Sequence, residues 1–276
     1  MKPRIASYYS CGTASAVTAK LTLAKYGETH DVEIVRCLVP EEHEDNDRFA
    51  KDCEVWFGRP ILNLASAEYA SCEDVWERTR YMSGVGGARC TVEMKKAVRW
   101  AFEEEWHPDL QAFGYTADEQ GRATRFREQN PEINLITPLI DAGLDKEACH
   151  AIIDRAGIVL PMMYRLGFNN ANCIGCVQAQ SPSYWNRVRR EFPPIFERRA
   201  ALSRKLGARL VKGTSGDRER IFLDELDPDA GLGEIEPAME CSLLCYMAEG
   251  DIATGEQVRG IKRASNKPTT EGENRE

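Results

Sequence analysis

Two closely spaced cysteine pairs are the clearest chemical signal in the sequence. Cys173 and Cys176 form a C-x2-C pair around Gly175, and Cys241 and Cys245 form a C-x3-C pair. Thiolates at such spacings can ligate zinc or an iron–sulfur cluster. Because one pair supplies half of a four-sulfur site, we expect four of five cysteines to form a metal centre: Cys90, Cys173, Cys176, Cys241 and Cys245. A redox-active dithiol and plain structural thiols are the alternatives.

Cys90 has a polar setting of its own. It follows a glycine-rich loop, opens a predicted helix and lies near Arg89 and Lys95 in sequence. A helix N-terminus and nearby cations lower the pKa of a cysteine, so Cys90 is a candidate catalytic thiol, with a buried cysteine as the alternative. The other cysteines stand alone and are expected to be small buried thiols: Cys11, Cys37, Cys53, Cys72 and Cys149.

A small polar turn, SCGTAS, joins the first predicted strand to the first predicted helix. Backbone N–H groups in such a turn, together with the helix N-terminus, can receive an anion. Gly12 permits close approach of the backbone, and hydroxyl donors are available from Ser10, Thr13 and Ser15. The turn from Ser10 to Ser15, with Cys11 contributing through its main chain, is therefore a candidate phosphate site. An ordinary helix cap at Thr13 is the alternative.

Two arginines follow the strand predicted near residues 110–115. Arg122 and Arg125 are spaced i, i+3 on one helical face, so both could grip one phosphate or sulfate. The carboxyl ends of parallel strands line the ligand crevice in open α/β sheets, which places these side chains well. A surface ion pair with Glu119 is the alternative.

The elements that must position these residues alternate between strand and helix. Strands are predicted at 4–9, 31–39, 60–65, 110–115, 133–136 and 220–223, and helices at 14–26, 47–57, 73–82, 91–106 and 145–156. This alternation predicts an open, mainly parallel, doubly wound α/β sheet over residues 1–160. Residues 161–261 are expected to form a helical, cysteine-bearing lobe that completes the site, and residues 262–276 a disordered tail.

The segment from Ser7 to Ser15 resembles the PP-loop of the adenine-nucleotide alpha-hydrolase-like superfamily, whose pattern is S-G-G-x-D-S. The chain keeps Ser10, Gly12 and Ser15, but carries Cys11 in place of the first glycine and Ala14 in place of the aspartate. The missing carboxylate argues against metal-assisted ATP cleavage, whereas a cradle of backbone amides tolerates both changes.

The order of the motifs over the first 130 residues resembles the phosphoadenosine-phosphosulfate (PAPS) reductase family. In such proteins a C-T-x-x-x-K segment, here Cys90 to Lys95, faces the nucleotide. The resemblance implies adenine-nucleotide binding by the turn together with Lys95, Arg122 and Arg125. Glu240-Cys241 also resembles the E-C-G-L-H tail of thioredoxin-coupled members, although Ser242 and Leu244 replace the glycine and the histidine.

That resemblance implies an oxidoreductase in which the Cys241 thiol attacks a sulfonucleotide and a thioredoxin-like reductant completes the release of sulfite. It also gives weight to an iron–sulfur cluster over zinc. Two other functions stay open: an ATP-dependent sulfurtransferase with a cysteine-ligated cluster, and a non-catalytic nucleotide- or metal-binding module.

Composition limits the partners. A net charge of −8 over 276 residues argues against broad attraction to nucleic acid, although the arginine-rich stretch 187–209 could line a local basic pocket. No apolar stretch is long enough to span a membrane, and the N-terminus has no signal-peptide pattern. We therefore expect a cytoplasmic enzyme without membrane partners that acts on a small nucleotide; a homodimer is compatible with the sequence.

Overall fold

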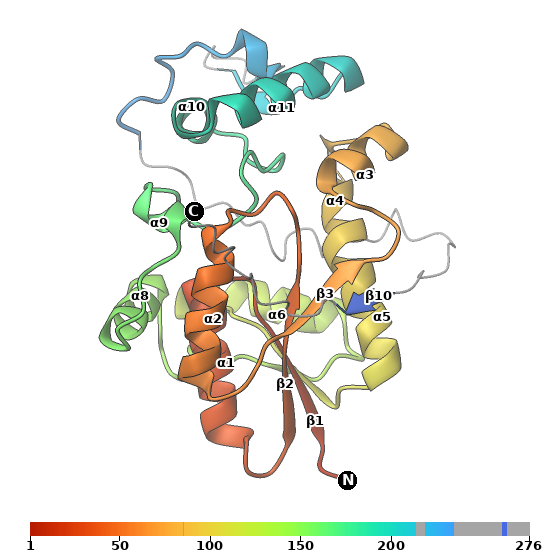
Figure 1. Ribbon diagram of the computed structural model, residues 1–276, viewed down its shortest axis with the longest axis vertical. Helices are drawn as coiled ribbons and strands as arrows, with labels where there is room; N and C mark the ends of the chain where they lie inside the picture. The colour runs from red at the N-terminus through yellow and green to blue at the C-terminus, as the bar shows by residue number, and fades with distance from the viewer. Residues whose placement is uncertain (85, 214–218, 235–260, 264–276) are drawn as a thin grey trace, which may run out of the picture.

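A mainly parallel sheet lies at the centre of the molecule (Figure 1). The computed structural model describes residues 1–84, 86–213, 219–234 and 261–263. In these ranges the sheet has the order β10-β3-β2-β1-β6-β7, in which β10 alone is antiparallel to its neighbour. Its strands are β1 (Arg4–Tyr8), β2 (Asp31–Cys37), β3 (Leu62–Ser66), β6 (Leu110–Ala112), β7 (Leu135–Ile136) and β10 (Ile261–Arg263). The predicted open, mainly parallel α/β fold class is confirmed.

Helices cover both faces of the sheet. Ile34 of β2 packs with α1 (Thr13–Tyr26), α2 (Asp45–Phe57) and α8 (Lys146–Arg155). The next residue, Val35, packs on the opposite face against Val98 and Phe102 of α5 (Ala97–Trp106). Successive side chains of a strand point to opposite faces of the sheet, so these two residues show that helices bury β2 on both faces. Helix α6 (Gln120–Gln129) packs beside Phe113 at the end of β6.

The long helix expected from Thr91 to Trp106 is interrupted. The structure begins it at α4 (Arg89–Thr91), continues through a π-helical turn η1 (Val92–Lys96) and ends with α5. A π-turn inserts one residue into the helical repeat and often marks a functional site. Here it lies in the part of the helix that carries Lys95 and Lys96.

A second lobe lies beyond the carboxyl ends of the strands (Figure 1). It contains α10 (Pro182–Glu191) and α11 (Pro193–Leu206), and its core also takes in Trp76 from α3 (Cys72–Thr79). The lobe predicted for residues 161–261 is therefore built partly on residues from the first 160.

The short helices are α7 (Pro138–Asp141), α9 (Met162–Arg165), η2 (Ala117–Glu119) and η3 (Leu223–Glu225). Two small hairpins pair β4 (Ser83–Gly84) with β5 (Gly87–Ala88), and β8 (Val211–Lys212) with β9 (Arg220–Ile221).

The first two residues of the disordered tail predicted for residues 262–276 lie in a strand. Lys262 and Arg263 belong to β10 and pair with Ala65 and Leu64 of β3. Ile261 packs on the apolar cluster around Leu64, an anchor that the polar composition of the segment did not indicate. The rest of the expected tail, residues 264–276, lies outside the described residues. Within the described ranges, no helix combines the length and the apolar character needed to cross a lipid bilayer.

Candidate functional site

The turn between β1 and α1 has an unusual backbone. Cys11 adopts a left-handed conformation with φ 56°, and Gly12 is the N-cap of α1 without a side-chain cap. The cap predicted as the alternative at Thr13 is therefore not formed. Inside the turn, the Ser10 N–H donates to Ser15 Oγ at 3.1 Å, and Ser15 Oγ donates to the Gly12 carbonyl at 2.8 Å. The Ser15 hydroxyl thus fixes the shape of the turn.

The Cys11 side chain packs into the interior of the protein. It is fully buried, and its thiol donates to the Asn46 carbonyl at 3.6 Å. Burial raises the pKa of this thiol far above its ordinary value, so Cys11 stays protonated. A positive φ costs a non-glycine residue of the order of 1 kcal/mol, and the glycine of the PP-loop pattern avoids that cost. Cys11 can therefore serve a bound anion only through its main chain.

Two neighbours approach the turn closely. A Cβ placed on Gly12 would lie 3.2 Å from the Tyr164 hydroxyl, so Tyr164 stands directly over the turn. A Cβ placed on Gly114, at the end of β6, would lie 3.1 Å from the Ser15 nitrogen and 3.2 Å from the Ala14 carbonyl carbon. Gly114 thus allows the strand end to pack against the first turn of α1.

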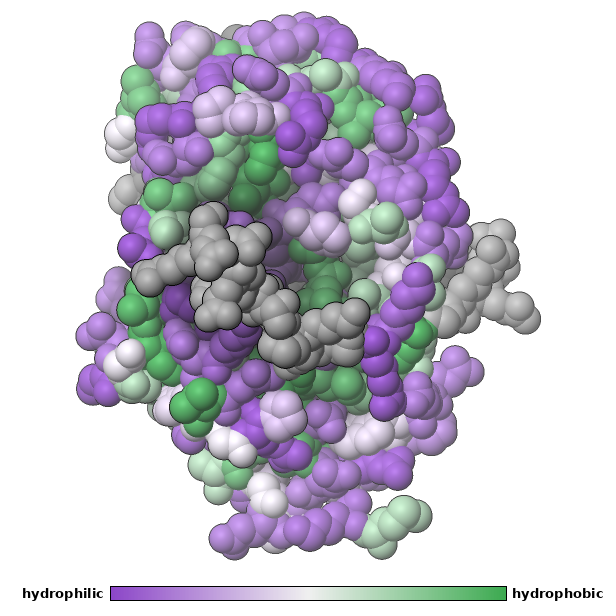
Figure 2. Space-filling view, in the orientation of Figure 1, coloured by the Kyte–Doolittle hydropathy of each residue, from purple (hydrophilic) through white to green (hydrophobic). Residues whose placement is uncertain are grey.

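The turn opens onto a cleft of about 500 Å³. Figure 2 shows this face of the molecule hollowed below the lobe that carries α10 and α11. The cleft is rich in cations: its lining includes Lys95, Lys96, Arg99, Arg122, Arg125 and Lys146, against the carboxylates Glu42, Asp118 and Glu119. In a chain with a net charge of −8, an excess of positive side chains in one cleft marks a site for an anionic ligand.

Several of these cations are held in place by carboxylates. Lys95 Nζ lies 3.3 Å from Glu42, and Arg99 Nε lies 3.0 Å from Glu103. Arg122 pairs with Glu119, which is the ion pair predicted as the alternative to ligand binding. Arg122 nevertheless lines the cleft as well. Lys96 and Arg99 are only 4% and 6% exposed. Both side chains are therefore held in the wall of the cleft and not in bulk solvent.

Aromatic rings supply the apolar part of the cleft. Tyr8, Tyr9 and Phe113 line it, and the rings of Tyr8 and Phe113 lie 5.0 Å apart. One thiol, Cys37 at the end of β2, also lines the cleft and donates to the Lys95 carbonyl at 3.6 Å. Burial raises its pKa to about 11, so this thiol is a weak nucleophile at neutral pH.

The cysteines of the second lobe gather elsewhere. Cys72, at the first position of α3, is buried in the apolar core of this lobe, against which Cys90 and Cys173 also pack. The hydrogen bond with Cys72 lowers the pKa of Cys90, and the same contacts with Cys173 and Cys90 raise the pKa of Cys72. Cys176 follows Cys173 in the C-x2-C knuckle and packs in the same apolar core.

Tyr184 holds the knuckle in shape. Its hydroxyl accepts from the Cys176 N–H at 2.8 Å and donates to the Cys173 carbonyl at 3.3 Å. Gly175 adopts φ 68° between the two cysteines, a left-handed conformation that favours glycine.

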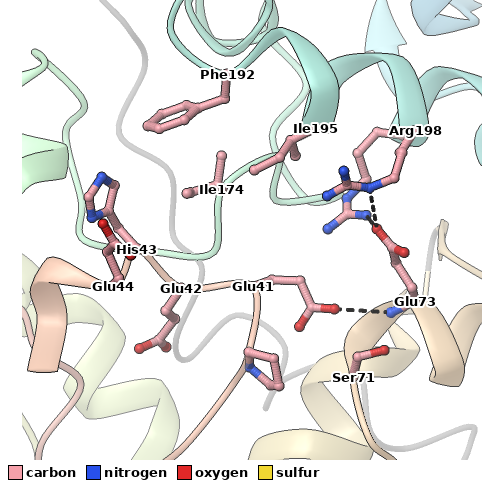
Figure 3. Close-up of a pocket in the computed structure, with 12 residues that line it drawn as sticks. Glu41, Glu42, His43, Glu44, Ser71, Glu73, Ile174, Phe192, Ile195 and Arg198 are labelled. Carbon is pink, nitrogen blue, oxygen red and sulfur yellow. Dashed lines mark hydrogen bonds and ion pairs between the residues drawn. The ribbon is translucent and has the colours of Figure 1, made fainter. Parts of the chain in front are cut away.

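A cavity of about 530 Å³ lies beside the knuckle (Figure 3). The Ile174 N–H donates to the Glu41 carbonyl at 2.8 Å, and a Glu41 carboxylate oxygen accepts from the Glu73 N–H at 3.2 Å. Arg198 and Arg199 from α11 both approach Glu73. The loop after β2, the start of α3 and α11 are thus tied together around the knuckle.

The predicted nucleotide-binding residues fall into two groups. Six of them line the cleft: Ser10, Gly12, Ser15, Lys95, Arg122 and Arg125. The other two, Cys11 and Thr13, have buried side chains outside its lining. Cys90, a predicted catalytic thiol, also lies outside the described lining and packs on the core of the second lobe. Cys241 and Cys245 lie outside the described residues.

Several cleft residues were missed by sequence reasoning. Arg99 follows Lys95 by four residues and Lys96 by three, so it shares a helical face with each of them, and that spacing was a usable signal. Lys146 and Tyr164 reach the cleft only through the tertiary fold, and no local pattern indicates them. Cys72 was expected to be a small buried thiol, and it is buried in the core of the second lobe, against which Cys90 and Cys173 also pack.

No protein-family model and no curated protein matches the sequence. Among solved structures, the chain is similar to phosphoadenylyl-sulfate (PAPS) reductase from Candida auris in a phosphate complex, with 12% identity, a TM-score of 0.39, and coverage of 60% of this chain and 78% of that one. It is also similar to the U34-tRNA thiolase NcsA from Methanococcus maripaludis with its 4Fe–4S cluster. That match has 12% identity and a TM-score of 0.40, and it covers 74% of this chain and 69% of the thiolase. Similarity at this level does not assign a function.

Proposed function

We propose that this chain is an enzyme that binds an adenine nucleotide in the cleft and acts on a sulfonucleotide, releasing sulfite by thiol chemistry. One observation carries the proposal: the β1–α1 turn opens onto a cleft of about 500 Å³, and the described residues that line it include six cations and three carboxylates. A cleft of this size accepts a nucleotide, and its charge selects a ligand with several negative groups.

The two ends of the cleft suit the two ends of a nucleotide. The Gly12 end offers main-chain amides and the N-terminus of α1 to a phosphate or sulfate. Tyr8 and Phe113 offer apolar ring surface to a heteroaromatic base. Lys96 and Arg99, nearly buried in the wall, would stabilise negative charge that develops on a departing phosphate, because fixed cations act strongly in a site that excludes water.

The reductive step needs a thiolate in line with the sulfur of the substrate. Among the described cysteines, Cys37 lines the cleft, but its pKa of about 11 leaves it protonated, and Cys90 lies outside the lining. We therefore assign the nucleophile to Cys241, which lies outside the described residues.

The proposed step balances as follows. The Cys241 thiolate bonds to the sulfur as the bond from sulfur to the phosphate oxygen breaks, and the nucleoside phosphate leaves with that electron pair. A dithiol of the thioredoxin type then attacks the S-sulfonated cysteine. Sulfite departs, the Cys241 thiol is restored, and the dithiol is oxidised to a disulfide after supplying two electrons.

An ATP-dependent sulfurtransferase is the alternative enzyme. Ala14 lines the cleft where the PP-loop pattern has a carboxylate, so the turn provides no metal ligand at that position for cleaving ATP. A non-catalytic binding module would use the same cleft without turnover.

The test is to incubate the protein with a sulfonucleotide and a reduced dithiol and to measure sulfite and nucleoside phosphate. We expect equal amounts of the two products. Cys241→Ser should abolish sulfite release and keep nucleotide binding, whereas the control Cys149→Ala, at a buried thiol of α8, should keep both. Pyrophosphate release from ATP and an acceptor, without sulfite, would instead support the sulfurtransferase, and binding without turnover would support the module.

A further inference from the structure

One cation of the cleft is paired with a carboxylate that is not part of the described lining. Arg99, on α5, lines the cleft, and its side chain is only 8% exposed. Its Nε lies 3.0 Å from Glu103 Oε1, one helical turn further along α5. The Glu103 side chain is 16% exposed and is not among the described residues that line the cleft. Glu103 would therefore not contact a ligand bound there.

Glu103 also contacts the strand that leads into the turn. Ala6 of β1 packs with Phe102 of α5, and Tyr8, two residues along the strand, points to the same face of the sheet. The Tyr8 hydroxyl donates to Glu103 Oε1, the oxygen that also pairs with Arg99. Burial raises the pKa of Tyr8 well above its ordinary value, so its hydroxyl remains a donor at neutral pH. One carboxylate oxygen thus joins Arg99 to the strand that ends at the turn.

The aromatic rings of the cleft also restrain Arg99. Its guanidinium carbon lies 5.5 Å from the centre of the Tyr8 ring and 5.6 Å from the centre of the Phe113 ring. Contacts of this kind between a cation and a ring are favourable. With Nε on Glu103 and two rings beside it, the guanidinium has little freedom to turn. A donor that is already fixed binds an anion at a lower cost in entropy.

From these contacts we infer that Glu103 is a positioning residue, which holds the Arg99 guanidinium in the orientation that binds an anionic group of the nucleotide. The inference rests on the proposed function, because that anionic group is the partner that Arg99 would meet. A guanidinium has several N–H donors in a rigid fork, so one guanidinium can meet Glu103 and an anion at the same time. Tyr8, through Glu103, then sets the position of this cation relative to the turn.

An ion pair that only stabilises the fold is the competing explanation, and the two explanations differ in sign. Glu103 places a negative charge close to a cleft for anions, so its charge alone opposes anion binding. If the pair only stabilised the fold, Glu103→Gln would remove this opposing charge and would tighten anion binding or leave it unchanged. If Glu103 orients Arg99, the same substitution weakens binding, because the guanidinium is no longer held toward the ligand.

The test is calorimetric titration of the full chain with PAPS and with inorganic pyrophosphate, a smaller anionic probe. We expect Glu103→Gln to raise the Kd of both ligands about tenfold, the loss typical of one charge-assisted hydrogen bond. The control Glu104→Gln removes the same charge from the next, exposed position of α5 and should leave both Kd values unchanged. Tighter or unchanged binding by the Glu103→Gln protein would overturn the inference.

Double-substitution cycles distinguish the orientation of Arg99 from a general loss of structure. In the Arg99→Gln background, Glu103→Gln should change the Kd by less than about twofold, because no guanidinium remains to be oriented. A second cycle leaves Arg99 intact. Tyr8→Phe removes the hydroxyl and keeps the ring, and its effect on the Kd should disappear in the Glu103→Gln background. If Glu103→Gln weakens binding equally with and without Arg99, the positioning role is wrong.

The outcomes also separate this inference from the proposed function. Nucleotide binding that Glu103→Gln does not weaken excludes the positioning role and keeps the nucleotide site. Pyrophosphate binding that Glu103→Gln weakens, without any binding of PAPS, supports the positioning role and contradicts the nucleotide site. If the wild-type protein binds neither ligand, both proposals are wrong.

Discussion

Gly114 offers a sharp test of how the turn is positioned. Replacing it by alanine would place a Cβ 3.1 Å from the Ser15 nitrogen and 3.2 Å from both the Ala14 carbonyl carbon and the Ser15 Cα. All three neighbours are backbone atoms, so the first turn of α1 has to shift by a few tenths of an ångström to relieve the contact. Overpacking of this kind typically costs about 1–3 kcal/mol of stability.

The same shift should weaken ligand binding, because the amides of the turn move relative to the opposite wall of the cleft. We expect Gly114→Ala to lower the free energy of unfolding in urea by about 1–3 kcal/mol. We also expect it to raise the Kd for an adenine nucleotide at least about tenfold, equivalent to about 1.4 kcal/mol. Urea titration followed by tryptophan fluorescence measures the first effect, and isothermal titration calorimetry the second.

Gly121 provides the matched control. It lies in α6 and lines the cleft, and a Cβ there would meet no atom within 4 Å. Gly121→Ala should therefore stabilise the protein by about 0.5–1 kcal/mol through helix propensity alone. If Gly114→Ala unfolds and binds nucleotide like the wild type, the close packing of β6 on the turn does not position the site, and the reasoning fails.

Two further predictions concern titratable groups. The pKa of about 11 for Cys37 implies that only about one thousandth of this thiol is ionised at pH 8. Alkylation of Cys37, followed by peptide mass spectrometry, should therefore be slow at pH 8, rise roughly tenfold per pH unit toward pH 11 and be blocked by bound nucleotide. Rapid modification at pH 8 would contradict the burial of this thiol. The Asp45 carboxylate accepts hydrogen bonds from Arg48 and from the Met162 N–H, and the bonds from Arg48 lower its pKa. Its contribution to stability is therefore present above the unfolded pKa of about 3.9 and is lost as the pH falls through the lowered folded value. Asp45→Asn should lower the free energy of unfolding by about 1–2 kcal/mol at pH 7, and the difference from wild type should disappear in acid. Asp52→Asn removes a more exposed partner of the same arginine and should lower the free energy of unfolding by less. Equal losses of stability at both positions would refute the assignment.

Local signals were enough to locate the turn and its first basic partners. The strand, the small polar turn and the helix are contiguous in sequence, and parallel strands place their carboxyl ends at one edge of the sheet. Ser10, Gly12 and Arg122 could therefore be assigned to one site before the fold was known, and the resemblance to PAPS reductases added Lys95. The structure places all four in the cleft lining.

Other features depend on tertiary packing that no local pattern encodes. Tyr164 reaches Gly12 only because α9 folds back over α1, and Cys72 shares an apolar core with Cys173 only because α3 joins the core of the second lobe. The left-handed conformation of Cys11 was also hidden, since cysteine rarely adopts it. Cys241 and Cys245, which their spacing predicts as partners of the C-x2-C knuckle, lie outside the described residues, so their role stays a prediction.

The central claim is that the basic cleft beyond the first turn holds an adenine nucleotide. Calorimetric titration of the wild-type protein with ATP, adenosine phosphosulfate and PAPS measures this most directly. We expect saturable binding with one preferred nucleotide, and weaker binding in the Arg125→Gln variant, which removes one cation from the lining of the cleft. An absence of binding by all three nucleotides at millimolar concentration would contradict the claim.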